Sequence, residues 1–253
     1  STRGAPIKSE GGAGLRSECD RENCLRETEA FIFGIFHLFT DFCRSNFKFA
    51  DKHFIESKVI QQHLSNKCGL SSPYTLITNS RESITTSWSG GDRLIAKPLV
   101  HTFWESDDGG VTTLAPVEIA RTDIQDDELK VFPLIFQDFI PTRKDIRAVR
   151  VGDEVIAFRI NCERRTVDWK DYNKEIHAQR YPLTESIRDR IVTFCNAIGC
   201  DLCTIDFVID EEERMMFLEL NSTGQYKFME AQQGSKAIIT ESIARHIMET
   251  LTQ

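Results

Sequence analysis

Two polar residues interrupt an apolar run near the carboxyl end of the chain. The run reads FLELN, and Glu219 and Asn221 lie two positions apart within it. A β-strand would direct both side chains to one face, because side chains alternate along a strand. A carboxylate and an amide on one face offer the oxygen ligands that a hard cation such as Mg²⁺ prefers.

An earlier strand, CTIDFVID, supplies a second carboxylate, Asp206. A hairpin with its turn in the acidic residues between the two strands would pair Asp206 with Phe217 and Thr204 with Glu219. In that register Asp206 lies diagonal to Glu219 on the same face, with roughly 5 to 8 Å between neighbouring β-carbons. Three oxygen ligands then converge, which suits a complex of Mg²⁺ with a nucleotide.

The alternative for these polar residues is a strand edge that faces solvent. The register above places Met215 and Phe217 on the face of the carboxylates, which predicts that the carboxylates lie beside a buried surface. Gly224 then follows in NSTGQ, a turn that can bring backbone close to a ligand. Both features favour a metal site.

Two lysines are candidates for nucleotide phosphates. Lys97 lies in the apolar run RLIAKPLV, where the alternative is a side chain that snorkels from a strand edge. Burying its charge unpaired would cost several kcal/mol, so we expect it to contact phosphate. Lys58 lies in a predicted helix, and either a phosphate contact or simple solvation fits it.

Two arginines lie in the strands of a predicted β-hairpin, Arg147 in the first and Arg159 in the second. DIRAVRV and EVIAFRIN are joined at Gly152-Asp153, a strong hairpin signal. A two-residue turn would place Arg147 opposite Phe158 and send Arg159 to the other face, whereas a three-residue turn would pair the two arginines. We expect Arg147 to lie near a reacting carboxylate, and the role of Arg159 stays open.

The elements that position these residues follow from periodicity and stop signals. In the second predicted helix Val59, Ile60 and Leu64 point inward and Gly69 is the stop, and Thr184 and Gly199 are the caps of the third. Helices and strands alternate without a strict period, which predicts two α+β lobes. The predicted helices cover Glu22–Phe42, Phe54–Cys68, Thr184–Ile198 and Ser235–Leu251.

We predict three parts of the chain: residues 1–45, a remnant of an amino-terminal region plus a helix; residues 46–136, a smaller lobe with a phosphate-covering loop; and residues 137–253, a larger lobe with the metal site. The first 18 residues, rich in Gly and Ser, are expected to be a loop, a linker or the stump of a trimmed region.

Composition excludes several classes of protein. A net charge of −8 argues against nucleic acid or anionic membrane as a partner. No apolar stretch has the length of a membrane span and no signal region begins the chain, so we expect a cytoplasmic protein. Among eight cysteines only Cys200 and Cys203 have metal-ligand spacing, with Cys19 and Cys24 as the one plausible second pair. Reduced, mostly buried thiols are the expected state.

These motifs, in this order, resemble the ATP-grasp superfamily. Asp206 followed by LEL-N resembles its metal-binding strand pair, and Lys58 and Lys97 resemble the two lysines that reach the phosphates. The motif DIR, Asp145 to Arg147, resembles the one that follows the interlobe linker. The stretch FQDFIP resembles the interlobe linker, whose backbone binds adenine in that superfamily. It contains Gln137, Asp138, Phe139 and Ile140.

Within the superfamily, VDWKDYN and ELNSTGQYKFME resemble the ligases that macrocyclise microviridins and related graspetides. The resemblance assigns substrate binding to Asp168, Trp169 and Lys170, together with Arg159, although simple packing is the alternative for Trp169. Lys170 stands where that family has arginine, and Ser222-Thr223 replace its Pro-Asn. Lysine lacks the planar fork of arginine, so it offers a carboxylate or phosphate a point charge and not a bidentate contact.

The resemblance implies an α+β ATP-grasp fold with the nucleotide cleft between two α+β lobes. It implies ATP and Mg²⁺ as cofactors and Arg147 as the group that stabilises an acylphosphate. The implied substrate is a precursor peptide with a leader and a core of acidic and hydroxyl residues, whose acidic side chains are joined to Ser/Thr hydroxyls or Lys amines. A homodimer is one expectation for the assembly.

The rivals are a glutamate-adding or other amino-acid ligase of the same fold, a catalytically silent nucleotide-binding protein, and a peptide-binding scaffold. The first shares the ATP site and differs in its acceptor. The second would bind ATP without releasing ADP, and the third would not bind nucleotide.

Overall fold

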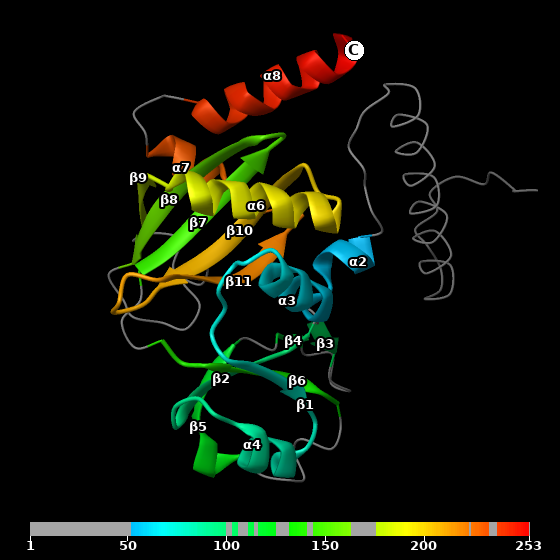
Figure 1. The fold of residues 1–253 in the computed structure, drawn as a ribbon, viewed down its shortest axis with the longest axis vertical. Helices are drawn as coiled ribbons and strands as arrows, with labels where there is room; N and C mark the ends of the chain where they lie inside the picture. Colours follow the sequence, from blue (N-terminus) through cyan, green and yellow to red (C-terminus); the bar gives the residue numbers. More distant parts are fainter. Residues whose placement is uncertain are drawn as a thin grey trace, which may run out of the picture. The chain divides into compact units, whose positions relative to one another are not determined.

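Five antiparallel strands form the larger of two main sheets in this computed structural model, in the order β11-β10-β7-β8-β9 (Figure 1). The strands are β7 (Lys144–Val151), β8 (Glu154–Cys162), β9 (Ile176–Tyr181), β10 (Leu202–Ile209) and β11 (Met215–Asn221). The structure describes residues 52–99, 103–105, 111–113, 116–124, 132–140, 144–162, 176–222, 224–232 and 237–252. They all belong to one unit, Phe47–Thr252.

The β7–β8 turn has two residues, as one of the two predicted registers requires. Val151 pairs with Glu154 and Arg147 pairs with Phe158. Gly152 has φ of 59°, a left-handed conformation that glycine adopts at little cost. Arg159 therefore lies on the opposite face of the sheet from Arg147.

Helices cover both faces of the larger sheet. On one face α6 (Glu185–Ile198) packs through Ile191, Phe194 and Ile198. Its predicted caps are confirmed: Thr184 Oγ1 accepts a hydrogen bond from Ile187 N, and Gly199 ends the helix with φ of 78°.

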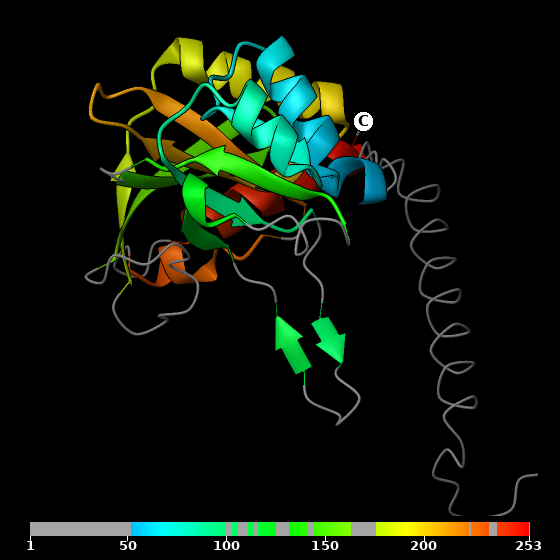
Figure 2. The same ribbon diagram turned by 90° about the horizontal axis from the view of Figure 1, so that it is seen from below.

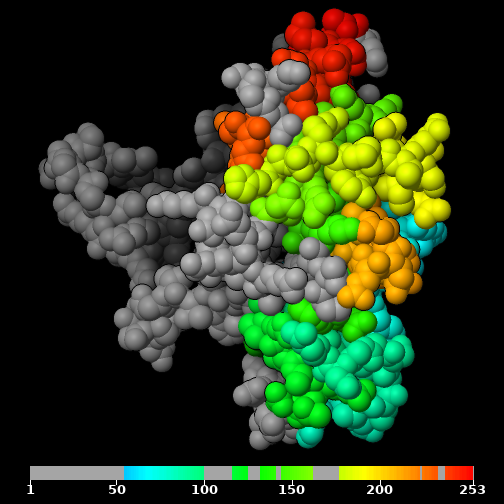
Figure 3. Space-filling view, turned by 90° about the vertical axis from the view of Figure 1, so that its left-hand side faces the viewer, coloured from blue at the N-terminus to red at the C-terminus, as the bar shows by residue number. Residues whose placement is uncertain are grey.

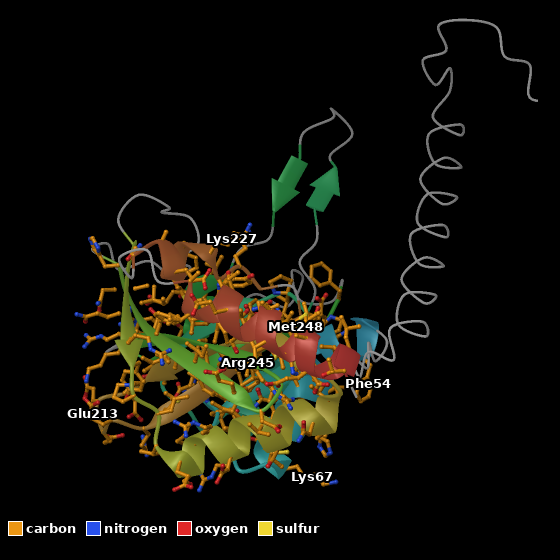
Figure 4. All side chains as sticks on the ribbon, turned by 90° about the horizontal axis from the view of Figure 1, so that it is seen from above. Phe54, Lys67, Glu213, Lys227, Arg245 and Met248 are labelled. Carbon is orange, nitrogen blue, oxygen red and sulfur yellow. The ribbon has the colours of Figure 1, made fainter. Side chains whose placement is uncertain are left out.

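The opposite face contacts two carboxy-terminal helices, where one helix over Ser235–Leu251 was predicted. A short helix, α7 (Lys227–Ala231), precedes α8 (Ile238–Thr252), and Met229 and Ile239 pack on the sheet. Figure 4 shows Arg245 and Met248 on α8, with the Met248 side chain 62% exposed.

The predicted helix Phe54–Cys68 is two helices, α2 (Lys52–Glu56) and α3 (Lys58–Lys67). Ser57 separates them and caps α3, since its Oγ accepts from Ile60 N at 3.5 Å. The inward orientation predicted for Val59 is wrong, because this side chain is 50% exposed. The buried side chains of α3 are Gln61 and Ser65, because the helix faces β11 with a hydrogen-bonding side chain. Gly69 ends it as predicted, with φ of 77°.

The smaller sheet has the order β1-β6-β2-β5 and is antiparallel throughout. A helix, α4 (Arg81–Ser87), packs on one face through Ile84 against Leu94 and Phe136. Two further strands, β3 (Phe103–Glu105) and β4 (Val111–Thr113), pair with each other, as Figure 2 shows. The remaining elements are β1 (Thr75–Thr78), β2 (Arg93–Lys97), β5 (Val117–Ala120), the 3₁₀ turn η1 (Arg121–Asp123) and β6 (Leu134–Asp138).

The predicted division of the chain stays a prediction. The boundary between residues 136 and 137 lies inside β6, and Ile55 and Leu64 of α2 and α3 pack against the core of the larger sheet. Residues 1–45, with the predicted helix Glu22–Phe42, lie outside the described residues. None of the helices described above is long and apolar enough to cross a membrane.

The described thiols are free and mostly buried. Cys195, Cys200 and Cys203 are buried and Cys68 is partly so. Cys19 and Cys24 lie outside the described residues, and the described part of the chain contains no group of three or more His, Cys, Asp and Glu that could hold a metal ion. The reduced state expected for the thiols is the state of Cys68, Cys195, Cys200 and Cys203.

Candidate active site

The β10–β11 register differs from the predicted one. Asp206 pairs directly with Glu219 and Thr204 pairs with Asn221, because a bulge at Leu218 interrupts the ladder between Asp206 and Phe207. The predicted pairs of Asp206 with Phe217 and of Thr204 with Glu219 are wrong. The bulge still leaves Asp206, Glu219 and Asn221 on one face of the sheet.

The turn at the other end of the hairpin accounts for one of the two residues by which the partner of Asp206 shifts, and the bulge accounts for the other. Ile209 pairs with Met215 rather than with Arg214, so the turn is one residue longer than predicted. Asp210 Oδ1 accepts hydrogen bonds from the backbone of Glu212 at 3.0 Å and of Arg214 at 2.8 Å. Glu213, at the tip of the turn in Figure 4, has φ of 60°. In Figure 3 this hairpin (orange) lies between α6 (yellow) and residues of the smaller sheet (green and cyan).

The prediction that Met215 and Phe217 share the face of the carboxylates is also wrong. Phe217 pairs with Phe207 and packs in the core under α6, where its ring centroid lies 5.1 Å from that of Phe194. Met215 packs against the same core. The bulge therefore separates an apolar stretch of β11 that faces α6 from a polar stretch that faces the opposite side.

Two carboxylates converge on one amide at this polar stretch. Asn221 Nδ2 lies 3.4 Å from Asp206 Oδ2 and 3.3 Å from Glu219 Oε1. A half-turn of the Asn221 amide would replace this nitrogen with its oxygen, giving three oxygen donors around one point. Asp206 is 8% exposed and the Glu219 side chain 13% exposed. Such a set of oxygens fits Mg²⁺.

Arg147 is held by the first of these carboxylates. It lies opposite Asp206 in the β7–β10 pairing, and its Nε and Nη2 donate to Oδ1 and Oδ2, both at 2.7 Å. Nη1 donates to the backbone oxygen of Gln225 at 3.2 Å. Arg147 thus places a buried positive charge beside the predicted metal residues.

Lys58 reaches the second carboxylate. Its Nζ lies 3.8 Å from Glu219 Oε2 and donates to the backbone oxygen of Pro98 at 3.0 Å. Pro98 directly follows Lys97, so Lys58 links the polar stretch of β11 to the end of β2. Of the two readings of Lys58, the structure excludes a side chain that is merely solvated, because only 12% of it is exposed.

Lys97 lies in a pocket beside these residues. Its Nζ donates to Gln137 Oε1 at 2.9 Å, and Gln137 Nε2 donates to Thr75 Oγ1 at 3.0 Å. Lys97 is 9% exposed, which excludes a side chain that snorkels into solvent. The pocket combines one face of the smaller sheet with α3 and the bulged residue of β11. It is lined by Lys58, Gln62, Thr75, Ile77, Lys97, Ile135, Gln137 and Leu218.

The predicted linker residues lie at the end of β6. Asp138 accepts a hydrogen bond from Gly91 N at 2.9 Å, so its carboxylate is used within the smaller sheet. Phe139 lies under the Arg93 guanidinium at 4.1 Å, and Ile140 follows it, partly buried. The backbone of these residues continues from the pocket that contains Gln137.

Three further predicted groups have different outcomes. Asp145 lies two residues before Arg147 in β7, on the same face. Arg159 lies on the opposite face, and its Nε is buried without a hydrogen-bond partner among the described residues. Asp168, Trp169 and Lys170 lie outside the described residues.

Gly224 lies close to the Thr204 side chain, and its predicted approach to a ligand stays a prediction. A Cβ at this position would lie 1.5 Å from Thr204 Oγ1. Glycine is therefore required for the chain to pass over Thr204 after β11.

Sequence reasoning missed Gln61, Thr75 and Leu218. Gln61 occurs three positions after Lys58, a spacing that places both on one side of a helix, so its role could have been found. Leu218 lines the pocket because of the bulge, for which the sequence has no glycine signal.

Comparisons with known proteins identify the family and the fold. A profile of the RimK-like ATP-grasp domain matches residues 56–247. No curated protein matched the chain.

Several solved structures share the fold. A RiPP-associated ATP-grasp ligase from Chryseobacterium gregarium, in complex with ADP and a leader and core peptide, has a TM-score of 0.68 at 22% identity, over 77% of this chain and 60% of that one. Macrocyclase MdnC from Microcystis aeruginosa MRC, bound with precursor peptide MdnA, has a TM-score of 0.72 at 21% identity, over 95% of this chain and 75% of that one. ATP-grasp ligase PsnB, complexed with minimal precursor, Mg and ADP, has a TM-score of 0.58 at 22% identity, over 77% of this chain and 58% of that one. This chain thus spans about 60% of the length of the first and third of these proteins.

Proposed function

Because the chain belongs to the RimK-like ATP-grasp family, we propose that it is an ATP-dependent ligase that activates carboxylates of a precursor peptide. The observation that carries the proposal is the convergence of Asp206 and Glu219 on Asn221, with Lys58 between this cluster and the pocket around Lys97. Oxygen ligands for a cation next to two lysines suit a metal–nucleotide complex.

ATP occupies the pocket in this proposal. Leu218 offers apolar surface to the adenine ring. The backbone N–H groups of Asp138 and Phe139 donate to Tyr74 O and Arg93 O, so we assign hydrogen bonds to the ring edge to the backbone of Ile140, which follows them. Lys97 and Lys58 contact the phosphates, whose negative charge attracts both cations strongly in a poorly solvated site.

Asp206, Glu219 and Asn221 would hold Mg²⁺, which supplies positive charge that offsets the phosphates when it is bound with the nucleotide. Arg147 already neutralises Asp206, and Lys58 lies near Glu219, so these two cations balance the two carboxylates before nucleotide arrives.

The reaction has two steps. A substrate carboxylate attacks the γ-phosphorus of ATP, giving an acylphosphate and ADP. A hydroxyl or amine of the same peptide then attacks the acyl carbon, loses its proton and displaces phosphate, so that each ester or amide bond removes one water from the peptide. Arg147 stabilises the negative charge that develops on the acyl group.

The proposal of a peptide substrate rests on the likeness to MdnC, described with precursor peptide MdnA, and to PsnB, described with a minimal precursor. The proposed substrate has a leader and a core of acidic and hydroxyl residues. A cytoplasmic location and a homodimer stay predictions.

The test is to incubate the protein with Mg²⁺, ATP and a short Thr- and Glu/Asp-rich peptide encoded beside its gene. We expect ADP release and peptide mass that falls by one water per ring. Stimulation of ADP release by free glutamate, with no change in peptide mass, would instead identify an amino-acid ligase. ATP binding without ADP release under any of these conditions would identify a silent nucleotide-binding protein.

A further inference from the structure

The amide of Gln61 forms three hydrogen bonds inside the protein. Nε2 donates to the backbone oxygens of Ile55 and Leu220, both at 2.8 Å, and Oε1 accepts from Leu220 N at 2.9 Å. Gln61 is 2% exposed. Since β11 is the last strand of the larger sheet, this amide occupies the place of a neighbouring strand at Leu220.

The residue held in this way separates two of the proposed metal residues. Leu220 lies between Glu219 and Asn221, so its peptide groups determine where both side chains point. Two residues after Leu220, Ser222 Oγ donates to Glu56 Oε1 at 2.6 Å. This hydrogen bond is a second attachment of the end of β11, in this case to α2.

The same helix carries one of the lysines. Lys58 lies three positions before Gln61, and residues with this spacing share a helix face. The hydrogen bonds between Gln61 and Leu220 hold helix α3 in place along β11. They thereby keep Lys58 beside Glu219, with 3.8 Å between Lys58 Nζ and Glu219 Oε2.

We propose that Gln61 is a positioning residue for the ligase reaction, which acts through Leu220 to fix Glu219 and Asn221 relative to Lys58. The inference rests on the proposed function. Without the amide, the strand and the helix can shift against each other, and a displacement of about 1 Å at reacting groups can cost on the order of 10²-fold in rate.

The test compares Gln61→Met, which keeps the length of the side chain, with Asn66→Met, which changes an exposed amide of the same helix. For Gln61→Met we expect a rise of about tenfold in the Mg²⁺ concentration for half-maximal ADP formation and a fall in kcat of about tenfold or more. Asn66→Met should match the wild type in both. Gln61→Asn, an amide one methylene too short to reach both groups of Leu220, tests the same point if the methionine variant does not fold.

Hydrogen exchange at the Leu220 amide gives a readout that does not need activity. We expect slow exchange in the wild type and in Asn66→Met, and exchange about tenfold faster or more in the folded Gln61 variant. A lower melting temperature with unchanged kcat and Mg²⁺ dependence would show a purely structural role and overturn the proposal, as would equal Leu220 exchange in all proteins. A wild-type protein without ADP formation would overturn the proposed function, and the Leu220 exchange rates would then decide whether Gln61 holds the strand.

Discussion

Arg147 and Asp206 form a buried bidentate ion pair across β7 and β10, with both nitrogen–oxygen distances 2.7 Å. Arg147 is 3% exposed and Asp206 8% exposed. Because the fork of arginine matches the two carboxylate oxygens, the pair fixes the direction of the Asp206 side chain as well as its charge.

Removing one partner should destabilise the protein strongly. We expect Arg147→Ala to lower the free energy of unfolding by about 3 to 5 kcal/mol, because it leaves Asp206 as an uncompensated buried charge. Urea denaturation measures the change. Arg245→Ala is the control: its pair with Glu154 is about half exposed and should cost about 0 to 1 kcal/mol. Equal losses in the two variants would contradict the assignment.

Lys97→Met should remove ADP formation while the fold survives. Methionine keeps the apolar stem but removes the charge proposed to contact phosphate, and we expect a loss on the order of 10²-fold or more in ADP formation. A coupled assay for ADP measures it, with circular dichroism as the check on folding. Lys144→Met, which removes a lysine paired with Glu213 at the hairpin turn, should keep normal activity. Normal turnover by folded Lys97→Met would remove the phosphate role.

Glu219→Gln should weaken the use of Mg²⁺ more than it weakens the fold. The amide keeps the size of the side chain but removes one negative charge from the cation site, so we expect a higher Mg²⁺ requirement and a rate lower by on the order of 10²-fold. The melting temperature and the Mg²⁺ dependence of peptide dehydration are the two measurements. Glu213→Gln, at the exposed turn, should change neither. If Glu219→Gln dehydrates the peptide normally, the metal assignment is wrong.

Gly224→Ala should destabilise the end of β11. The added Cβ would meet Thr204 Oγ1 at 1.5 Å, so Thr204 or the chain must move, and overpacking of this kind costs about 1 to 3 kcal/mol. Gly91→Ala serves as the comparison, because its Cβ would lie 3.4 Å from Asp138. In thermal unfolding, we expect Gly224→Ala to lower the melting temperature more than Gly91→Ala does. A similar small decrease in both variants would contradict the close approach of Gly224 to Thr204.

The β10–β11 turn should contribute stability that is lost in acid. Burial acts to raise the pKa of Asp210, but hydrogen bonds from the backbone and guanidinium of Arg214, the charge of Arg214 and the backbone of Glu212 outweigh it, and the pKa is lowered. A carboxyl whose folded pKa is depressed stabilises the fold above its unfolded pKa, about 3.9, and loses this contribution as pH falls through the folded value. The gap in unfolding free energy between wild type and Asp210→Asn should therefore be larger at pH 7 than at pH 3. A gap that does not change with pH would assign the effect to packing.

The sequence predicted the fold class, and it predicted that Glu219 and Asn221 share one face of the sheet. These predictions succeeded because they depend on local signals: turn residues, helix caps and the alternation of side chains along a strand. Gly152-Asp153 marked the β7–β8 hairpin, and the two-residue turn, one of the two registers considered, is the one that pairs Arg147 with Phe158. Thr184 and Gly199 have the chemistry of helix caps. The alternation of side chains along a strand was enough to place Glu219 and Asn221 on the same side.

What could not be predicted depends on contacts between distant segments. The turn is one residue longer than predicted, and the bulge at Leu218 inserts another residue into β11 without a glycine or proline. Counting back from the turn therefore gave Phe217 instead of Glu219 as the partner of Asp206. Val59, predicted to point inward, is exposed, and Gln61, for which no role was predicted, is buried. The reason is that α3 meets the backbone of β11, where an amide satisfies more groups than an apolar side chain.

The bulge at Leu218 also bears on how this hairpin can change over time. Asp206 and Glu219 lie on one side of it, and the turn from Asp210 to Arg214 lies on the other. The residues near the cation site are held by Arg147 and by the contact of Leu220 with Gln61, neither of which involves the turn. Insertions and deletions in the turn are thus insulated from the cation site, so the length of this loop is free to vary among descendants of the sequence while the chemistry is kept.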